Sequence, residues 1–426
     1  MKNSLSIKEI LKEDNKIIIK YACYGKWKEF LTCDSFYSSY NISIEKVPNS
    51  IAIIPFLANI LPIAWLFDLK IECFELDNVF YEAIPKIKKG YEEMYPLIKF
   101  GGKIEISRII KNEKDNSKEA TLFSGGVDAY CTLLRHISTK PDIITIFGAD
   151  IKLSDYNGIN NVNELNKEIA KELELNYQEI YSNFREIINY SNVQKSLEKN
   201  FKLEWWHDFQ HGMALIGLVA PLSYINGYNK VYIASSFCVK QKGQYTCASD
   251  PIIDNEFKYG NTLTVHDGYE LNRQDKIRLI CDIKNKLNIP KIKLRVCWES
   301  MGGKNCCHCE KCYRTIMGII TEKENPNDYY FKLTKEERKK MIKYLKSNLK
   351  YNTKNGNIPN YKPIQDRFIK NYNIEETPKD LIWFRTIKIG SKNPFYYNIR
   401  IKIKNKVKYL IKKIGGPQIW NEPYLD

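Results

Sequence analysis

The residues Ser124, Gly125, Gly126, Val127 and Asp128 have the composition of an anion-binding turn. An apolar run ends just before Ser124, and a helical pattern begins at Asp128. The first N–H groups of a helix have no partner within the helix and lie at the positive end of its dipole. Glycine has no Cβ, so a phosphate can approach the backbone closely. An ordinary strand-to-helix turn that needs glycine for its dihedral angles is the alternative.

Four cysteines follow the spacing C-x8-C-x2-C-x2-C. They are Cys297, Cys306, Cys309 and Cys312. Four thiolates can complete a tetrahedral Zn2+ site, and the alternative is that they bind an iron–sulfur cluster. A four-cysteine site has no open coordination position, so we expect a structural role. Cys307 and His308 lie between these positions, and we expect them to be neighbours of the site, with replacement of a ligand by either one as the alternative.

Five further polar residues are candidates for contact with a ligand: Asp150, Arg185, His211, Ser235 and Ser236. Asp150 can face a nucleotide or cap a turn, and Arg185 can meet a phosphate or carboxylate or simply lie at the surface. Ser235 and Ser236 can contact a phosphate or merely end a strand. A glycine follows His211 and permits close approach of a ligand, whereas a histidine of the core or of the site wall is the alternative.

The stretch Ser124-Gly125-Gly126-Val127-Asp128-Ala129 closely resembles the SGGxDS pyrophosphate loop of the PP-loop ATPases, also called adenine nucleotide α-hydrolases. That family cleaves ATP between the α and β phosphates and adenylates a substrate. Ala129 replaces the last serine of the motif, whose hydroxyl can bond the pyrophosphate. Together with the cysteine spacing, the loop makes residues 119 to 320 similar to 7-cyano-7-deazaguanine synthase of queuosine biosynthesis.

The resemblance implies an ATP-dependent enzyme that uses Mg2+ and holds one Zn2+ through the four cysteines. We expect it to adenylate a carboxylate or carbonyl of a small or macromolecular substrate, releasing pyrophosphate and then AMP as ammonia adds. We assign catalysis to Asp128, Ser124 and Arg185. We assign cofactor binding to Ser124, Gly125, Gly126, Val127, Asp128, Asp150, Ser235, Ser236 and His211. The alternatives are a PP-loop enzyme that thiolates RNA and a catalytically inactive, zinc-stabilised module that binds nucleotide or nucleic acid.

The pattern of strands and helices predicts the scaffold of these sites. Strands are expected at 119–123, 142–147, 176–181, 230–235 and 292–296, and helices at 128–137, 161–174, 205–219 and 273–287. This alternation predicts a doubly wound, parallel five-stranded α/β sheet like that of the adenine nucleotide α-hydrolases. The stretches 249–254 and 265–268 are polar and turn-rich, and we expect a loop that can recognise a charged substrate, with a long solvated loop as the alternative.

Segments on either side of this sheet predict two more regions. Strands at 17–21, 42–44, 69–74 and 103–107 with a helix at 77–91 indicate an N-terminal α+β domain over residues 1–117. The PP-loop domain then covers 118–325, and a basic, mainly helical region covers 326–426. In the latter we expect a helix at 333–349 and a loop at 352–363.

Charge is concentrated in the C-terminal region. The chain of 426 residues has a net charge of +16, and residues 331–426 hold 23 Lys and Arg against 8 Asp and Glu, so 23 − 8 = +15. Basic and apolar residues alternate over 400–408, with aromatic residues nearby at Trp383, Phe384 and Tyr409. This pattern is compatible with binding to RNA or to an anionic surface, and with a solvated face.

Composition also bears on the compartment. The 12 cysteines follow no secretory signal, which predicts a reducing, cytoplasmic location. The run 51–67 has no charged residue but contains Pro55 and Pro62, so we expect a buried core segment and no transmembrane segment. A homodimer is compatible with the sequence.

Overall fold

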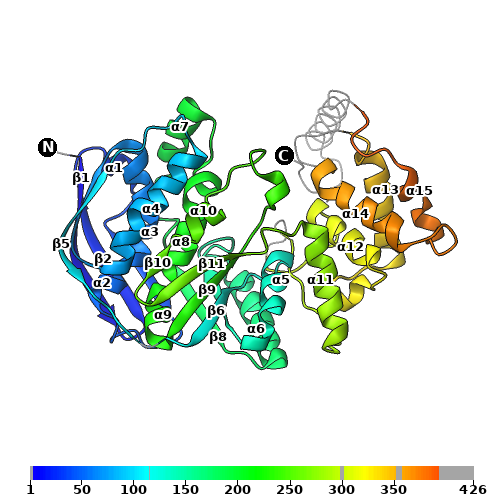
Figure 1. Cartoon of the computed structure of the whole chain (residues 1–426), viewed down its shortest axis with the longest axis horizontal. Coiled ribbons are helices and arrows are strands. Elements are labelled where there is room, and N and C mark those ends of the chain that lie inside the picture. The colour runs from blue at the N-terminus through cyan, green and yellow to red at the C-terminus, as the bar shows by residue number, and fades with distance from the viewer. Residues whose placement is uncertain (1–2, 115, 298–301, 352–356, 393–426) are drawn as a thin grey trace, which may run out of the picture. The chain divides into compact units, whose positions relative to one another are not determined.

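A single mixed sheet of 11 strands dominates the computed structural model, which describes residues 3–114, 116–297, 302–351 and 357–392 (Figure 1). The strands are β1 (Ser4–Glu13), β2 (Lys16–Cys23), β3 (Ser35–Tyr40), β4 (Lys70–Asp77), β5 (Lys103–Ile110), β6 (Lys118–Leu122), β7 (Asp142–Phe147), β8 (Tyr177–Ser182), β9 (Tyr228–Ala234), β10 (Lys258–Tyr259) and β11 (Thr262–Asp267). Their order is β10-β11-β9-β6-β7-β8-β3-β2-β1-β4-β5. The expected α/β class is confirmed, but the expected size of five strands is wrong, because the N-terminal strands extend the same sheet.

Five neighbouring strands, β8-β7-β6-β9-β11, are parallel to one another. In chain order they run 3-2-1-4-5, so the strand order reverses between β6 and β9. In open parallel sheets, ligands bind beyond the carboxyl ends of the strands at such a switch point. The first four expected strands are confirmed as β6 to β9.

The fifth expected strand, at 292–296, is wrong, because these residues are not in a strand and β11 takes the fifth place. β11 pairs with β9 from Leu263 opposite Lys230 to Asp267 opposite Ala234. The expected polar loop at 249–268 is therefore wrong over β11. A short helix, α10 (Pro251–Asp254), lies at the start of the same stretch.

The N-terminal strands join the parallel strands through an antiparallel pairing of β3 with β8. Phe36, Ser38 and Tyr40 alternate inward along β3, so its polar sequence still has one buried face. The strand expected at 42–44 is wrong. There the N–H of Ile44 donates to the carbonyl of Asp14 (2.8 Å) outside the sheet.

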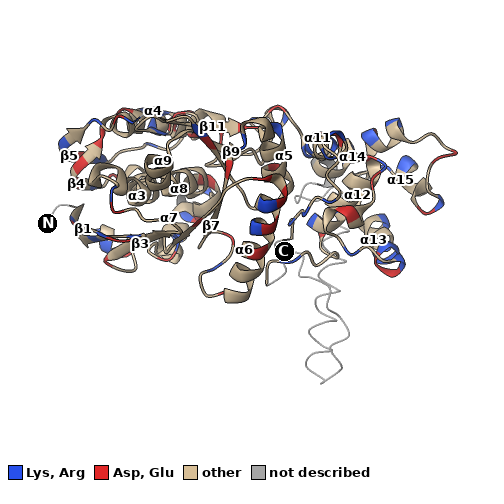
Figure 2. Cartoon of the chain, turned by 90° about the horizontal axis from the view of Figure 1, so that it is seen from below, with Lys and Arg blue, Asp and Glu red and all other residues tan. Residues whose placement is uncertain are grey.

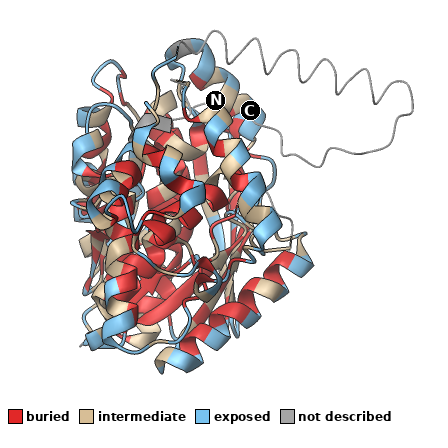
Figure 3. Cartoon of the chain, turned by 90° about the vertical axis from the view of Figure 1, so that its right-hand side faces the viewer, coloured by how far each residue is buried: buried red, intermediate tan, exposed pale blue. Residues whose placement is uncertain are grey.

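Helices cover the sheet in this first part of the chain: α1 (Trp27–Phe30), α2 (Asn49–Ala52), α3 (Ile54–Phe67), α4 (Asn78–Met94), α5 (Val127–Arg135), α6 (Tyr156–Leu173), α7 (Tyr190–Phe201), α8 (His211–Leu218) and α9 (Ala220–Asn226). Figure 3 shows buried faces in red and exposed faces in pale blue. α3 is apolar on all sides and buried, which confirms a core segment. It packs against α8, where a Cβ added to Gly217 would lie 2.4 Å from the Cβ of Ala58. Among the described residues, no helix combines the length and the apolar character needed to cross a bilayer.

The contacts group residues up to Glu270 in one compact unit and residues from Leu271 onward in a second. This division falls at neither position suggested by the sequence, 117 or 325. The second unit contains α11 (Arg273–Lys286), α12 (Glu310–Thr321), α13 (Lys335–Asn348), α14 (Asn357–Asn371) and α15 (Ile382–Thr386). The helices expected at 273–287 and 333–349 are observed, whereas the loop expected at 352–363 is wrong from Asn357, where α14 begins.

One buried carboxylate connects three helices of the second unit. Glu322, just after α12, accepts hydrogen bonds from Gln274 of α11 (2.7 Å) and from Arg367 and Asn371 of α14 (3.0 and 3.1 Å). Its side chain is 5% exposed. A buried charge that is paired on several sides fixes the relative positions of the elements that supply its partners. The basic segment 400–408 and Tyr409 lie outside the described residues.

Candidate nucleotide and metal sites

The glycine turn lies at the switch point of the parallel strands. β6 lies between β7 and β9, and the chain leaves its carboxyl end through Phe123, whose N–H donates to Ile144 (2.7 Å). Gly125 has φ +76°, in the left-handed region that favours glycine, and Gly126 is the N-cap of α5. The side chain of Ser124 is exposed and accepts a hydrogen bond from the N–H of Gly126 (3.4 Å). The turn therefore directs the N-terminal N–H groups of α5 toward the carboxyl edge of the sheet.

The first turn of α5 buries the residues on either side of Asp128. Val127 and Ala129 are buried, and Asp128 is partly exposed in the first helical turn. Position 129 therefore belongs to the packed face of the helix. The alanine removes the motif's hydroxyl, and the backbone N–H groups of the turn do not depend on it. The structure places Ser124, Gly125, Gly126, Val127 and Asp128 in one turn, as their adjacency in the sequence requires.

The two predicted serines, Ser235 and Ser236, follow the carboxyl end of β9 and differ in exposure. Ser235 is 1% exposed. Its hydroxyl donates to the carbonyl of Phe237 (2.6 Å), and its N–H donates to the backbone carbonyl of Asp267 (2.8 Å). Ser236 is exposed. Of the two hydroxyls, the one of Ser236 is therefore directed to solvent, and the one of Ser235 shapes the turn.

Asp267, which the sequence placed in a polar, turn-rich stretch, is a buried carboxylate at the end of β11. Burial alone would raise its pKa, but hydrogen bonds from His136 (3.1 Å) and Thr132 (2.8 Å) and the nearby Arg135 hold the pKa below its usual value. Thr132 and Arg135 belong to α5 and His136 follows it directly. Asp267 therefore fixes the helix that begins at the glycine turn.

Two of the predicted residues, Arg185 and His211, contact Trp206 of a π-helical turn, η2 (Trp206–Gln210). The guanidinium of Arg185 donates to the carbonyl of Ala149 (3.1 Å) and lies 4.3 Å from the ring centroid of Trp206. The ring of His211 meets the same indole edge-on at 5.0 Å. Burial lowers the pKa of His211, and the carboxylates of Asp150 and Asp254 oppose this. The lowered pKa makes the His211 imidazole neutral near pH 7. The π-helical turn itself is of interest because short π-helical segments are frequent at functional sites.

Asp254 and His266, which the sequence placed in polar stretches able to recognise a charged substrate, instead form a buried carboxylate–histidine pair in the same unit. Asp254 accepts hydrogen bonds from Nδ1 of His266 (2.8 Å) and from Oγ of Ser249 (2.7 Å), all through Oδ2. A Cβ added to Gly212 would lie 2.4 Å from the other oxygen, so the start of α8 approaches Asp254 closely. The sequence pattern that could have predicted the burial of His266 is the alternation along β11, in which His266 occupies an inward position.

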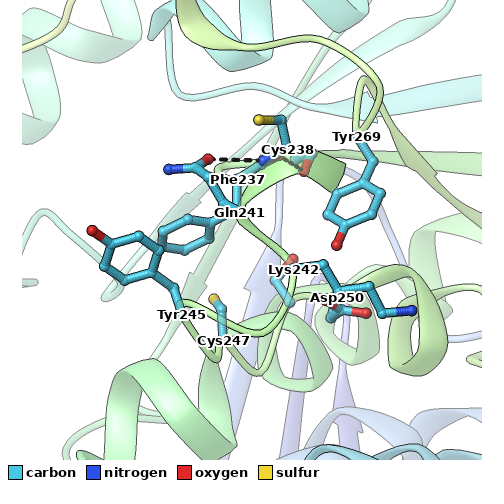
Figure 4. A pocket seen from close by; sticks show the side chains of 10 residues that line it. Phe237, Cys238, Gln241, Lys242, Tyr245, Cys247, Asp250 and Tyr269 are labelled. Carbon is cyan, nitrogen blue, oxygen red and sulfur yellow. Dashed lines mark hydrogen bonds between the residues drawn. The ribbon is translucent and has the colours of Figure 1, made fainter. Parts of the chain in front are cut away.

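A small pocket opens beside these strand ends (Figure 4). The rings of Phe237 and Tyr245 stack with centroids 5.5 Å apart on one side, and the hydroxyl of Tyr269 points toward Asp250 on the other (Figure 4). Burial raises the pKa of the Asp250 carboxyl. Lys242 provides a positive charge at the same wall. The pocket has a volume of about 10 Å³, which is room for about one water molecule, between the aromatic wall and the side chains of Asp250 and Lys242.

The four cysteines of the second unit form one compact cluster, with all four sulfur atoms within 4.8 Å of one another. The Sγ atoms of Cys297 and Cys309 are 3.9 Å apart, and those of Cys306 and Cys312 are also 3.9 Å apart. Thiolates placed tetrahedrally at about 2.3 Å from Zn2+ lie about 3.8 Å from each other. The geometry therefore fits a single four-coordinate ion such as zinc. A cluster with several iron atoms would separate its ligands further.

The backbone supports these sulfur atoms. The N–H groups of Cys309 and His308 point to the sulfur of Cys306 (3.3 and 3.5 Å), and the N–H of Cys312 points to the sulfur of Cys309 (3.4 Å). Asn305 holds the approaching chain, because its Oδ1 accepts from the N–H of Val296 (2.9 Å) and its Nδ2 donates to Leu294 (2.8 Å). Such contacts orient metal ligands and stabilise their charge.

The two extra residues within the cysteine motif face away from the cluster. Cys307 has φ +60°, and its sulfur accepts from the N–H of Lys332 (3.4 Å). His308 is exposed, and its Nδ1 contacts the carbonyl of its neighbour Cys306 (2.7 Å). Neither belongs to the group of residues able to hold the ion, as expected from the sequence.

No protein-family model and no curated protein matches the sequence. The likeness to PP-loop ATPases therefore depends on the residues of the glycine turn and the cysteine cluster themselves. Any function has to be argued from where the fold places these residues and what they can bind.

Proposed function

We propose that the chain is an AMP-forming PP-loop enzyme that adenylates a carboxylate or carbonyl group and then transfers the activated group to a nucleophile, most simply ammonia. The observation that carries this proposal is the position of the turn from Ser124 to Asp128. It combines a left-handed glycine, the N-terminus of α5 and the switch point between β6 and β9. These three features together favour a phosphate group.

The chemistry follows from this arrangement. An oxygen of the substrate attacks the α-phosphorus of ATP, and the bond from that phosphorus to the bridging oxygen breaks, so that pyrophosphate leaves. The N–H groups of Gly125 to Asp128 and the hydroxyl of Ser124 stabilise the charge that develops on the departing oxygens. Asp128, in the first turn of α5, is the residue that would hold Mg2+, and the ion would neutralise polyphosphate charge. The nucleophile then attacks the activated carbon, and AMP leaves with the electrons of the carbon–oxygen bond.

Residues at the neighbouring strand ends are assigned to the substrates. Arg185 is held on Trp206 with its guanidinium directed by the carbonyl of Ala149, so a phosphate or carboxylate partner meets a fixed cation. His211, neutral near pH 7 for the reason given above, is suited to accept a proton from the incoming nucleophile.

Zinc has a structural role in this proposal. Cys297, Cys306, Cys309 and Cys312 would use all four of its coordination positions, so the ion offers no site for a substrate.

The test uses the full chain and has two measurements. The first is binding of α,β-methylene-ATP with Mg2+ by calorimetry, and the second is release of pyrophosphate and AMP from ATP with ammonium and a panel of heteroaromatic carboxylic acids. Ser124→Ala and Asp128→Ala are each expected to weaken binding about tenfold or more, because each removes a contact to a charged group. Asp34→Ala is the control, since Asp34 is exposed and lies before β3.

The outcomes separate the proposal from its rivals. Turnover that depends on a carboxylic acid and falls in both variants supports it. Equal nucleotide binding by wild type and both variants would refute the assignment of the turn. Nucleotide binding with no pyrophosphate release across the panel would refute the enzymatic reaction and favour a binding module.

A further inference from the structure

A basic groove runs along α13 in the second unit. It has a cavity volume of about 510 Å³ and is lined by one face of α13 and by Asp380 of η5 (Lys379–Leu381). The lysines on this face share a regular spacing and are Lys335, Lys339, Lys343 and Lys346. Figure 2 shows the Lys and Arg residues of α13 in blue. Positions separated by three or four residues lie on the same side of a helix, so the four ammonium groups form one row.

These four lysines keep their charge available to a partner. Arg338, in the same groove, is already neutralised by a bidentate ion pair with Asp380 (2.6 and 3.1 Å). None of the four lysines forms an ion pair with another residue in the part of the chain that the structure describes. By contrast, Lys340 on another side of α13 pairs with Glu336 and Glu337. The groove therefore presents four uncompensated positive charges.

An aromatic ring lies at the end of this row. The indole N–H of Trp383 donates to the carbonyl of Asp380 (2.8 Å), and the ammonium of Lys346 lies 5.6 Å from the centroid of the ring. The side chain of Trp383 is partly exposed, whereas its neighbour Phe384 is buried in the unit. A row of cations that ends at a partly exposed aromatic ring is the pattern of surfaces that track a polynucleotide backbone and stack its bases.

We infer that this groove, defined by the four lysines and Trp383, binds a single-stranded nucleic acid. Phosphates lie along the lysines and a base contacts the indole. From Lys335 to Lys346 the helix rises by about 17 Å, which corresponds to roughly five nucleotides at about 3.4 Å each. The lysines contact phosphates rather than base edges, so binding is independent of sequence. The inference does not depend on the proposed reaction in the first unit.

A lipid surface fits the groove less well. A helix that lies on a membrane inserts an apolar face between the headgroups. In α13 the residues Met341 and Leu345 are fully buried against the unit, and Ile342 is half-buried among the lysines of the groove, so the exposed side of the helix presents charge rather than a broad apolar face. The positive residues instead line a concave surface, where charge is complementary to a narrow polyanion.

The test measures anisotropy of fluorescein-labelled oligonucleotides of 4, 8 and 16 nucleotides with the full chain, between 50 and 200 mM salt. With four phosphate contacts the affinity of wild type is expected to fall about 50-fold over this range, since the slope is about −0.7 per contact for single strands. Removal of two contacts in Lys339→Glu/Lys343→Glu reduces the expected fall to about sevenfold. At 50 mM salt this variant is expected to bind at least about tenfold more weakly than wild type.

A matched control exists on α7. Lys195→Glu/Lys199→Glu has the same spacing and the same change in net charge, on an exposed helix face of the first unit. It is expected to retain the affinity and the salt slope of wild type. Trp383→Leu is expected to weaken binding about fivefold or more, and Trp383→Phe is expected to restore most of it, because stacking needs only a ring.

Each outcome decides the inference. Single-stranded RNA and single-stranded DNA are measured side by side. Binding of either one that is lost in the α13 variant and kept in the α7 control supports the inference. Equal loss in the α7 control would show that net charge alone is responsible and would overturn it. Tighter binding to duplex DNA, to an acidic peptide or to phosphatidylserine vesicles, lost in the same variant, would assign the groove to another partner and would also overturn it. The unfolding temperature of each variant shows that the fold is intact.

Discussion

Replacement of one cysteine in the cluster should remove the metal, whereas replacement of its neighbour should not. Cys309→Ser is the informative change, because Cys309 is both a predicted ligand and the N-cap residue of α12. Serine is itself a favourable N-cap, so this substitution keeps the cap and removes only the thiolate. Cys307→Ser is the matched control, since the sulfur of Cys307 faces the N–H of Lys332 instead of the cluster.

The magnitude follows from mass action. A ligand that binds only the folded state at 1,000 times its dissociation constant stabilises that state by about 4.1 kcal/mol. A structural zinc site is commonly tighter than this, so the figure is a lower bound. In a unit of this size, 1 kcal/mol shifts the unfolding temperature by about 2–4 °C. Loss of the metal in Cys309→Ser should therefore lower the unfolding temperature of the second unit by at least about 8–16 °C.

Two measurements check this prediction on the same samples. Elemental analysis should give one zinc per wild-type chain and per Cys307→Ser chain, and well under one in Cys309→Ser. Calorimetry should show the lowered transition only in Cys309→Ser. A full zinc content in that variant, or its loss in Cys307→Ser, would contradict the assignment of ligands. Iron and sulfide with visible absorption would instead establish an iron–sulfur cluster.

Two further predictions concern the first unit. Gly217→Ala places a Cβ 2.4 Å from that of Ala58, so overpacking between α8 and α3 should destabilise the unit by about 1–3 kcal/mol, measured by urea denaturation. The pKa of Asp267 is depressed in the folded state, so its stabilising contribution is present above the unfolded pKa of about 3.9 and is lost as pH falls through the folded value. The stability difference between wild type and Asp267→Asn should therefore shrink as pH falls below about 4. A difference that does not vary between pH 3 and pH 6 would contradict this account.

Each of the strands that the sequence predicted correctly has at least one apolar residue at an inward position, as Ile180 has in β8 between the buried Gln178 and Ser182. β7 is an apolar run, and β6 and β9 lead into turn residues, so their type and place follow from local pattern. The sequence did not predict β11 because its inward positions are the polar residues Thr262, Thr264 and His266. Inside the protein the hydroxyl of Thr262 donates to the carbonyl of Tyr228 (2.7 Å), and Nδ1 of His266 donates to Asp254 (2.8 Å). Hydrogen bonds that make such residues acceptable in a core are tertiary and leave no trace in the periodicity.

The segment 292–296 shows the opposite error. Its alternation of apolar and basic residues is that of a strand, yet Asn305 binds the backbone of Leu294 and Val296 and leads the chain into the cysteine cluster. The four ligands were predictable because thiolate spacing is set by coordination geometry, which is local. The meeting of Arg185, Trp206 and His211 was not, because a π-helical turn brings them together and sequence spacing does not encode it.

The N-terminal strands are part of the scaffold of the candidate site, not an attachment to it. Without β3, the strand β8 would be an edge with unpaired backbone groups. The same residues brace the segment after β8 that carries Arg185. Thr32 donates to the carbonyl of Glu186 (2.6 Å), and Asn183 accepts from the N–H of Tyr37 (2.8 Å). The cation proposed to meet substrate is thus positioned from one side by Trp206 and from the other by strands that a five-stranded PP-loop sheet would not contain. Whatever distinguishes the substrate of this chain is therefore expected to be recognised at the end of the parallel sheet where β8 meets β3.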